Sequence, residues 1–159
     1  MIKTELKPVK KLYLLRHAKS SWEDPFLRDY DRPLNKRGRR QAKAMGKYFQ
    51  EKGFDIDLIL CSGALRTRQT LEILLEYYDY EEEIEFRDEI YAASVSALKN
   101  LILEANVNSL LVIGHNPELN MLADDLTGEF LTMPTCQLAV IDMKSGNLDI
   151  FIRPDDGRK

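Results

Sequence analysis

The chain has 159 residues, of which 44% are hydrophobic and 31% are charged, and its formal net charge is −3. This length and composition predict one globular domain with a substantial core, and the negative charge argues against a general nucleic-acid-binding protein. No apolar run approaches the roughly 20 residues of a membrane-spanning helix, and no apolar stretch of signal-peptide length follows the first residues, so we expect a cytoplasmic protein that binds no membrane.

Short apolar runs alternate with longer segments of helical periodicity along the chain. The runs have the length and composition of buried parallel strands and lie at 12–15, 58–61 and 110–113. Apolar residues at helical spacing occupy the segments 42–49, 71–78, 98–105 and 119–126. Strands that alternate with helices predict an α/β domain with a mainly parallel sheet.

The last part of the chain has a different pattern. Two β-rich pieces, 137–143 and 148–153, flank a turn at 144–147, and this predicts a C-terminal antiparallel strand pair. Together, these patterns predict a single three-layer α/β/α domain over residues 1–159, with loose ends at 1–8 and 155–159. A basic segment at 36–43 and an acidic run at 76–89 are interpreted as solvated surfaces.

Both histidines of the chain follow apolar runs directly, as Arg16-His17 and Gly114-His115. The carboxyl ends of the strands in an open α/β sheet form the edge where ligands bind. The third run leads through a glycine-containing turn to Arg66 at the start of a helix, and helix N-termini favour anions. Because arginine binds phosphate through several parallel hydrogen bonds, this combination predicts a site for a phosphoryl group.

The segment Leu15 to Trp22, with the sequence LRHAKSSW, resembles the signature of the histidine phosphatase superfamily and, closely, that of its SixA-type phosphohistidine phosphatase branch. Four further segments match the family in order, at 31–34, 37–42, 61–70 and 114–117. The family usually has proline where Gly63 stands in this chain.

The resemblance implies a role for each of five side chains. His17 is expected to attack phosphorus and to form a covalent phosphohistidine that water then hydrolyses. Arg16, Arg32 and Arg66 are expected to bind the phosphoryl oxygens, and His115 to complete the pocket. No cofactor and no metal are expected, because phosphoryl transfer needs mainly positioning and charge stabilisation and the acidic, histidine and cysteine residues show no metal-ligand spacing.

A general acid is the least defined member of this set. Many members of the superfamily protonate the leaving oxygen with a glutamate or aspartate, and Glu89 is the best positional candidate here. The SixA-type branch is described as lacking a clear acid at this point, and Glu89 lies in the acidic run, so a surface role is the alternative. Ser62 is interpreted as the N-cap of the helix that begins at Ala64.

The expected function is a metal-independent phosphatase, most specifically a protein phosphohistidine phosphatase for a histidine-phosphorylated signalling or carrier protein in signal transduction. The short chain leaves no room for a large substrate lid, which suits a phosphorylated protein, and a monomer is expected. One alternative is a general small phosphomonoesterase or a Ser/Thr phosphoprotein phosphatase. Another is a module that binds phosphorylated partners without turnover.

Overall fold

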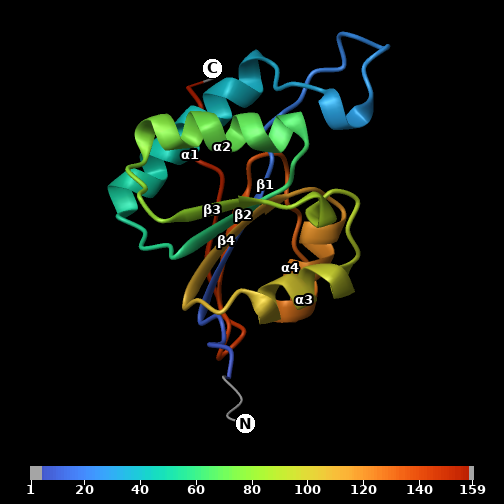
Figure 1. The fold of residues 1–159 in the computed structure, drawn as a ribbon. Coiled ribbons are helices and arrows are strands. Elements are labelled where there is room, and N and C mark those ends of the chain that lie inside the picture. The colour runs from blue at the N-terminus through green and yellow to red at the C-terminus, as the bar shows by residue number, and fades with distance from the viewer. Residues whose placement is uncertain (1–4, 158–159) are drawn as a thin grey trace.

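The fold is a single α/β domain in a computed structural model that describes residues 5–157 (Figure 1). Six strands form one sheet in the order β3-β2-β4-β1-β5-β6. They are β1 (Lys11–Arg16), β2 (Leu58–Cys61), β3 (Glu83–Phe86), β4 (Ser109–Gly114), β5 (Leu138–Asp142) and β6 (Leu148–Ile152). The first four run parallel, and β5 is antiparallel to both β1 and β6. The predicted fold class and the C-terminal strand pair are confirmed.

Two helices cover each face of this sheet, with α1 and α2 on one side and α3 and α4 on the other (Figure 1). Their bounds are α1 (Lys36–Lys52), α2 (Leu65–Tyr77), α3 (Val95–Glu104) and α4 (Glu118–Thr127). Two single turns of 3₁₀ helix, η1 (Asp29–Asp31) and η2 (Asp88–Ile90), interrupt the loops near the site. Every helix predicted from apolar spacing is present.

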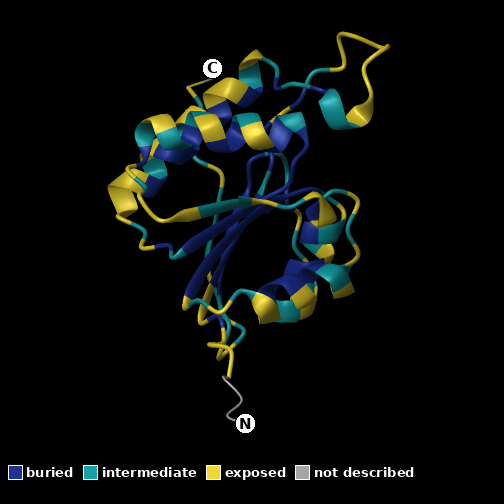
Figure 2. Ribbon diagram, in the orientation of Figure 1, coloured by how far each residue is buried: buried dark blue, intermediate teal, exposed yellow. Residues whose placement is uncertain are grey.

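Strand β1 shows why the apolar runs form central strands. Successive side chains of a strand point to opposite faces, so Tyr13 and Leu15 pack in the core under α1 and α2, while Leu12 and Leu14 pack under α3 and α4. All four are buried (Figure 2). The run is continuous rather than alternating because both faces of the sheet are covered.

Helix α1 has clear start and stop signals. The Asn35 side chain accepts a hydrogen bond from the Gly38 N–H at 2.8 Å, and Gly53 ends the helix with a left-handed φ of 61°. Gly38 itself lies against the backbone of Lys19, where a Cβ atom would come within 2.0 Å of the carbonyl oxygen. This close approach holds the start of α1 against the segment that follows His17.

Three features differ from the sequence-based expectations or lie beyond them. Strand β3 falls in the acidic run that was interpreted only as a solvated surface. Helix α2 begins at Leu65, after Ala64, so Ser62 is not its N-cap residue. Of the predicted loose ends, residues 1–4 and 158–159 lie outside the described part of the chain. Residues 5–8 are exposed and have no regular secondary structure. The 154–157 segment lies along α1, where Asp156 pairs with Arg37 at 3.6 Å.

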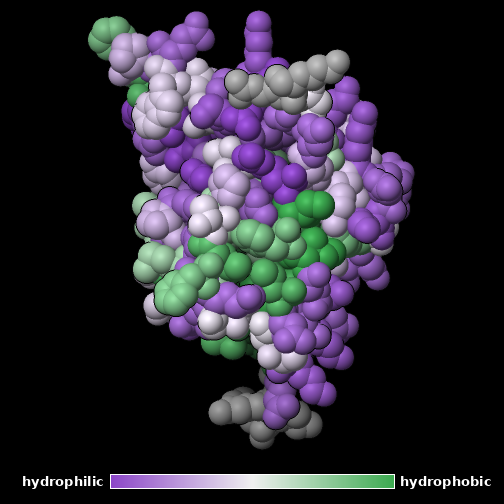
Figure 3. Space-filling model, turned by 180° about the vertical axis from the view of Figure 1, so that it is seen from behind, coloured by the Kyte–Doolittle hydropathy of each residue, from purple (hydrophilic) through white to green (hydrophobic). Residues whose placement is uncertain are grey.

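The face seen from behind carries a group of apolar side chains (Figure 3). On that side β6 forms the edge of the sheet, and its apolar residues are only half buried: Leu148, Ile150, Phe151 and Ile152. Among residues 5–157, no helix combines the length and the apolar character that a membrane crossing requires.

Candidate active site

The ends of three neighbouring strands bring the candidate residues together. Strand β4 lies between β2 and β1, with Gly114 in register with Arg16. The backbone N–H of His17 donates to the Gly114 carbonyl at 3.0 Å, and the N–H of Ser62 donates to the Ile113 carbonyl at 3.1 Å. His17, Ser62 and His115 therefore emerge side by side at the carboxyl edge of the sheet.

His17 is buried, and its two ring nitrogens have different partners. Nδ1 lies 2.7 Å from the carbonyl oxygen of Ala18, which can only accept, so Nδ1 carries the proton. Nε2 is then unprotonated, and its lone pair accepts a long hydrogen bond from the Nε of Arg66 at 3.4 Å. Burial, reinforced by the nearby charges of Arg66 and Arg16, lowers the pKa of His17 to about 3. His17 is thus a neutral imidazole with an available nucleophilic nitrogen at neutral pH.

His115 lies opposite, with its ring centroid 5.3 Å from that of His17. Its Nε2 is 2.8 Å from the hydroxyl oxygen of Ser62, and its Nδ1 is buried without a hydrogen-bond partner among the residues that the structure describes. Burial and the charge of Arg66 lower the pKa of His115 to about 4. This second imidazole is therefore also neutral at neutral pH.

Three guanidinium groups converge on the same place. Arg66, in the first turn of α2, is buried, and so is Arg32. Arg16 donates from Nη1 to the Met133 carbonyl at 3.0 Å, while its buried Nε has no partner among residues 5–157. Arg32 donates to the Ser20 hydroxyl at 2.6 Å. Holding three such charges together, two of them buried and Arg16 partly buried, is costly unless an anion offsets them.

Asp29 supplies a negative charge to this group. Its carboxylate accepts from Arg32 Nε at 3.1 Å and from Arg66 Nη2 at 3.0 Å, and its carbonyl accepts from Arg66 Nη1 at 2.6 Å. The Tyr91 hydroxyl donates to the same carboxylate at 2.7 Å. Burial alone would raise the pKa of Asp29, but the hydrogen bond from Tyr91 and the charge of Arg66 lower it to about 2.

A cavity of about 420 Å³ is lined by all five predicted residues, Arg16, His17, Arg32, Arg66 and His115. Its remaining lining residues are Lys19, Ser20, Trp22, Asp29, Asn116 and Thr135. Sequence reasoning did not select Asp29, although its position three residues before Arg32 is a usable signal. Trp22, three-quarters exposed at the rim, lies over the Arg32 guanidinium at 3.5 Å.

Glu89 is not brought into this cavity. Its side chain is exposed and pairs with Arg87 at 2.6 Å, and the hydrogen bond from Arg87 lowers the pKa of Glu89. The role of Glu89 as a general acid stays a prediction. The carboxylate that the structure does place beside His17 and Arg66 is Asp29. Within residues 5–157, no three His, Cys, Asp or Glu side chains are grouped as metal ligands.

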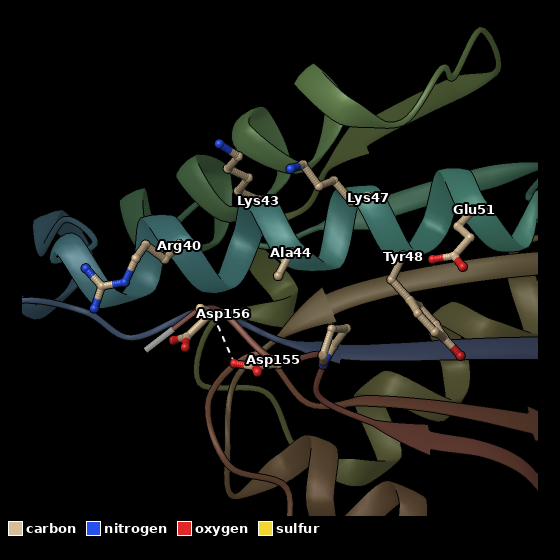
Figure 4. A pocket seen from close by; sticks show the side chains of 10 residues that line it. Arg40, Lys43, Ala44, Lys47, Tyr48, Glu51, Asp155 and Asp156 are labelled. Atoms are coloured by element: carbon tan, nitrogen blue, oxygen red, sulfur yellow. Dashed lines mark hydrogen bonds between the residues drawn. The ribbon is translucent and has the colours of Figure 1, made fainter. Parts of the chain in front are cut away.

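A second cavity, of about 450 Å³, lies between α1 and the 154–157 segment (Figure 4). Lys43 and Lys47 of α1 point away from that segment, toward the ring of Tyr77 on α2 at 5.4 and 5.7 Å. Asp155 and Asp156 lie on the other side of α1 (Figure 4), where the Asp155 carboxylate accepts from the Gly157 N–H at 2.9 Å. This cavity contains no histidine and no buried unpaired cation.

The sequence of this chain is similar to a known family and to known proteins. The family model described as "Histidine phosphatase superfamily (branch 1)" matches residues 12–90. An uncharacterized chloroplastic protein of Arabidopsis thaliana is 33% identical over 143 residues, which make up 83% of this chain and 66% of that protein. An uncharacterized protein of Mycobacterium tuberculosis is 35% identical over 111 residues, 69% of this chain and 67% of that protein. The chain therefore spans about two thirds of the length of each.

Two solved structures are similar over almost the whole chain. One carries the name phosphohistidine phosphatase SixA, from Agrobacterium tumefaciens, and is 33% identical with a TM-score of 0.86, covering 93% of this chain and 100% of its own. The other is described as the protein histidine phosphatase SixA complexed with tungstate; it is 26% identical with a TM-score of 0.75, covering 91% of this chain and 97% of its own.

Proposed function

Because the chain belongs to the histidine phosphatase superfamily, we propose that it is a metal-independent protein phosphohistidine phosphatase that works through a transient phosphohistidine on His17. The observation that carries the proposal is the state of His17. The imidazole is neutral, its unprotonated Nε2 accepts only a long hydrogen bond from Arg66, and the residue lines a cavity together with Arg16, Arg32 and Arg66. Binding an anion needs the three arginines, whereas only nucleophilic attack needs the unprotonated nitrogen.

The reaction has two steps. The lone pair of His17 Nε2 forms a bond to phosphorus, while the bond from phosphorus to the substrate nitrogen breaks and its electron pair stays on the leaving imidazole, which takes a proton from water. Water then attacks phosphorus, the bond to Nε2 breaks with its electron pair returning to Nε2, and phosphate leaves after the attacking water has given up a proton to solvent. Arg16, Arg32 and Arg66 stabilise the charge on the phosphoryl oxygens in both steps.

The carboxylate in the site favours phosphohistidine over a phosphate ester. Asp29, with a pKa of about 2, is ionised at neutral pH and carries no proton for a leaving alkoxide. An imidazole leaves more easily and needs less help from an acid. The alternative, a phosphomonoesterase or Ser/Thr phosphoprotein phosphatase, would require a separate donor, for which Glu89 is the candidate. A binding module without turnover is the least supported function, because it needs no unprotonated nucleophilic Nε2.

A phosphorylated protein is the substrate class that fits the rim of the site. The loop from Trp22 to Arg28 is exposed throughout and stands away from the body of the domain (Figures 1 and 2). A phosphorylated side chain can reach the cavity beside this loop without enclosure. The free thiols of Cys61 and Cys136 are typical of a reducing compartment, which supports our proposal of a cytoplasmic enzyme. We also propose that the enzyme is a monomer and acts in phosphohistidine signalling.

The deciding experiment compares three substrates side by side, with a chelator present. We expect a phosphohistidine peptide to be turned over faster than a phosphoserine peptide, and an activated aryl phosphate to be hydrolysed as well. Faster turnover of phosphoserine would favour the ester hydrolase. Loss of all turnover on chelation, restored by a divalent cation, would overturn the metal-independent mechanism, and absence of turnover with every substrate would favour the binding module.

A further inference from the structure

Ser62 is a fully buried hydroxyl at the end of β2, between the strand and α2. Its oxygen accepts a hydrogen bond from the Ala64 N–H at 3.2 Å. The other polar atom in contact with it is Nε2 of His115, at 2.8 Å. A buried hydroxyl needs an acceptor for its own proton, and the backbone N–H of Ala64 cannot be one.

Two arrangements of protons are possible across the Ser62–His115 contact. If Nε2 carries the proton and donates to Ser62, the Ser62 proton is left without an acceptor and Nδ1 of His115 is an unpaired acceptor. If Ser62 donates to Nε2, both atoms of the contact are satisfied and the His115 proton lies on Nδ1. The second arrangement leaves one buried polar group unpaired rather than two, and it is therefore the more stable of the two.

In the second arrangement, the one polar group left unpaired is the Nδ1–H of His115, which is a hydrogen-bond donor. Nδ1 of His115 is shielded from solvent and has no partner among the residues that the structure describes. The His115 ring lies 5.3 Å from that of His17, and both residues line the same cavity, so an acceptor oxygen brought close to Nδ1 would satisfy this N–H. A phosphoryl group bound for attack by His17 brings such oxygens.

We propose that Ser62 is a positioning residue that holds His115 as the Nδ1–H tautomer, so that His115 donates a neutral hydrogen bond to a phosphoryl oxygen. The free imidazole side chain prefers the opposite tautomer, with its proton on Nε2, so the fold has to enforce this one. The kinetic part of the inference rests on the proposed function; the protonation state of the resting protein does not. The low pKa of His115 agrees with a neutral ring.

Nitrogen NMR on the uniformly ¹⁵N-labelled protein tests the tautomer directly. The chain has only two histidines, so the ring signals of His17→Ala assign those of His115. At pH 7 we expect His115 Nδ1 to show the shift of a protonated nitrogen and Nε2 that of an unprotonated one. A protonated Nε2 in the wild type would overturn the proposal without the need for any variant at Ser62.

Ser62→Ala separates positioning from stability. We expect it to move the His115 signals toward the Nε2–H tautomer and to lower kcat/KM about tenfold, the size of one hydrogen bond to the transition state, with both an aryl phosphate and a phosphohistidine peptide. Ser94→Ala is the matched control, because Ser94 caps α3 by accepting from the Ala97 N–H; we expect it to lower stability and leave both readouts unchanged.

The possible outcomes distinguish this inference from the proposed function. An unchanged His115 tautomer in Ser62→Ala would overturn the role of Ser62, even if the enzyme is a phosphohistidine phosphatase. A shifted tautomer with an unchanged kcat/KM would show that His115 does not donate to the phosphoryl group, and would also overturn the proposal. If the tautomer shifts and aryl phosphate turnover falls while phosphohistidine is never hydrolysed, Ser62 keeps its role and the proposed substrate is wrong.

Discussion

The cavity at His17 and the cavity beside α1 have similar volumes, about 420 and 450 Å³, and basic side chains line both. They differ in how those charges are placed. At the first cavity Arg32 and Arg66 are buried and fixed by Asp29, whereas at the second Arg40, Lys43 and Lys47 are exposed. Buried and fixed guanidinium groups keep their field against solvent screening; exposed lysines do not. Burial, and not the number of cations, therefore separates a candidate active site from a basic surface.

The largest effect is expected at His17. His17→Ala removes the nucleophilic nitrogen and should abolish turnover of every substrate, while circular dichroism and the thermal transition show a folded protein. Rapid acid-free quenching of the wild type during turnover should trap phosphate on His17, stable to base and labile to acid. Label on Ser20 or Ser62, or residual activity above a few per cent of wild type, would contradict the assignment.

Arg66→Lys is the next largest expected change. Arg66 donates to Asp29 through two nitrogens and to His17 Nε2 through the third, and lysine cannot reproduce this fork. We expect a loss of about 2 kcal/mol or more in transition-state stabilisation, roughly 30-fold in kcat/KM. Arg68→Lys, on the exposed side of the same helix, is the control and should change kcat/KM less than twofold. If the two substitutions lowered kcat/KM equally, the buried position of Arg66 would not explain its effect.

The pH dependence of stability should reveal the buried histidines. The pKa values of His17 and His115 are about 3 and about 4, below the usual 6.5, so between pH 6.5 and 4 the unfolded chain binds more protons than the folded one. The urea midpoint should therefore fall as pH is lowered from 7 to 5, while both histidine Cε1–H resonances stay constant. Asp29, with its pKa of about 2, contributes no change in this window. Histidine resonances that titrate near pH 6.5 would show an open, hydrated site.

A smaller effect is expected at Glu89. Its carboxylate is exposed and pairs with Arg87 outside the cavity, so Glu89→Gln should change phosphohistidine hydrolysis less than threefold. Phosphoserine and aryl phosphate should be compared in the same variant. A hundredfold loss with phosphoserine alone, within the usual range of 10²–10⁴ for a positioned acid, would show that the 88–91 segment moves and that Glu89 is the general acid.

The smallest effect is expected at the cavity beside α1. Lys43→Ala combined with Lys47→Ala removes two exposed cations that face Tyr77, and should leave the kcat/KM for an aryl phosphate within twofold of wild type. Any change with a phosphorylated protein should fade as salt is raised, as for an exposed charged surface. A salt-independent loss with the aryl phosphate would show that the two cavities are coupled.

Continuous apolar runs were sufficient to predict β1, β2 and β4, because helices cover both faces of the sheet there. Strand β3 was missed because it is an edge strand with exposed glutamates, and only Ile84 packs into the core. The residues of the candidate active site also differ in whether a local sequence pattern predicts them. His17, Arg66 and His115 follow strands or begin a helix, so topology alone brings them together. Asp29 begins the single turn η1, and beyond its local pairing with Arg32 it is held by side chains 37 and 62 residues away, contacts that no local pattern encodes.

The space around Gly63 limits which residues can stand at position 63. A Cβ atom there would lie 2.3 Å from the Tyr30 hydroxyl and 2.1 Å from a carboxylate oxygen of Asp88, and those two side chains share a hydrogen bond of 2.5 Å that joins η1 to η2. A side chain at position 63 would therefore require the tips of Tyr30 and Asp88 to move, which would break the hydrogen bond between η1 and η2. Among homologues, the Tyr30–Asp88 pair should be more frequent with glycine than with proline at position 63, a bias that an alignment can test.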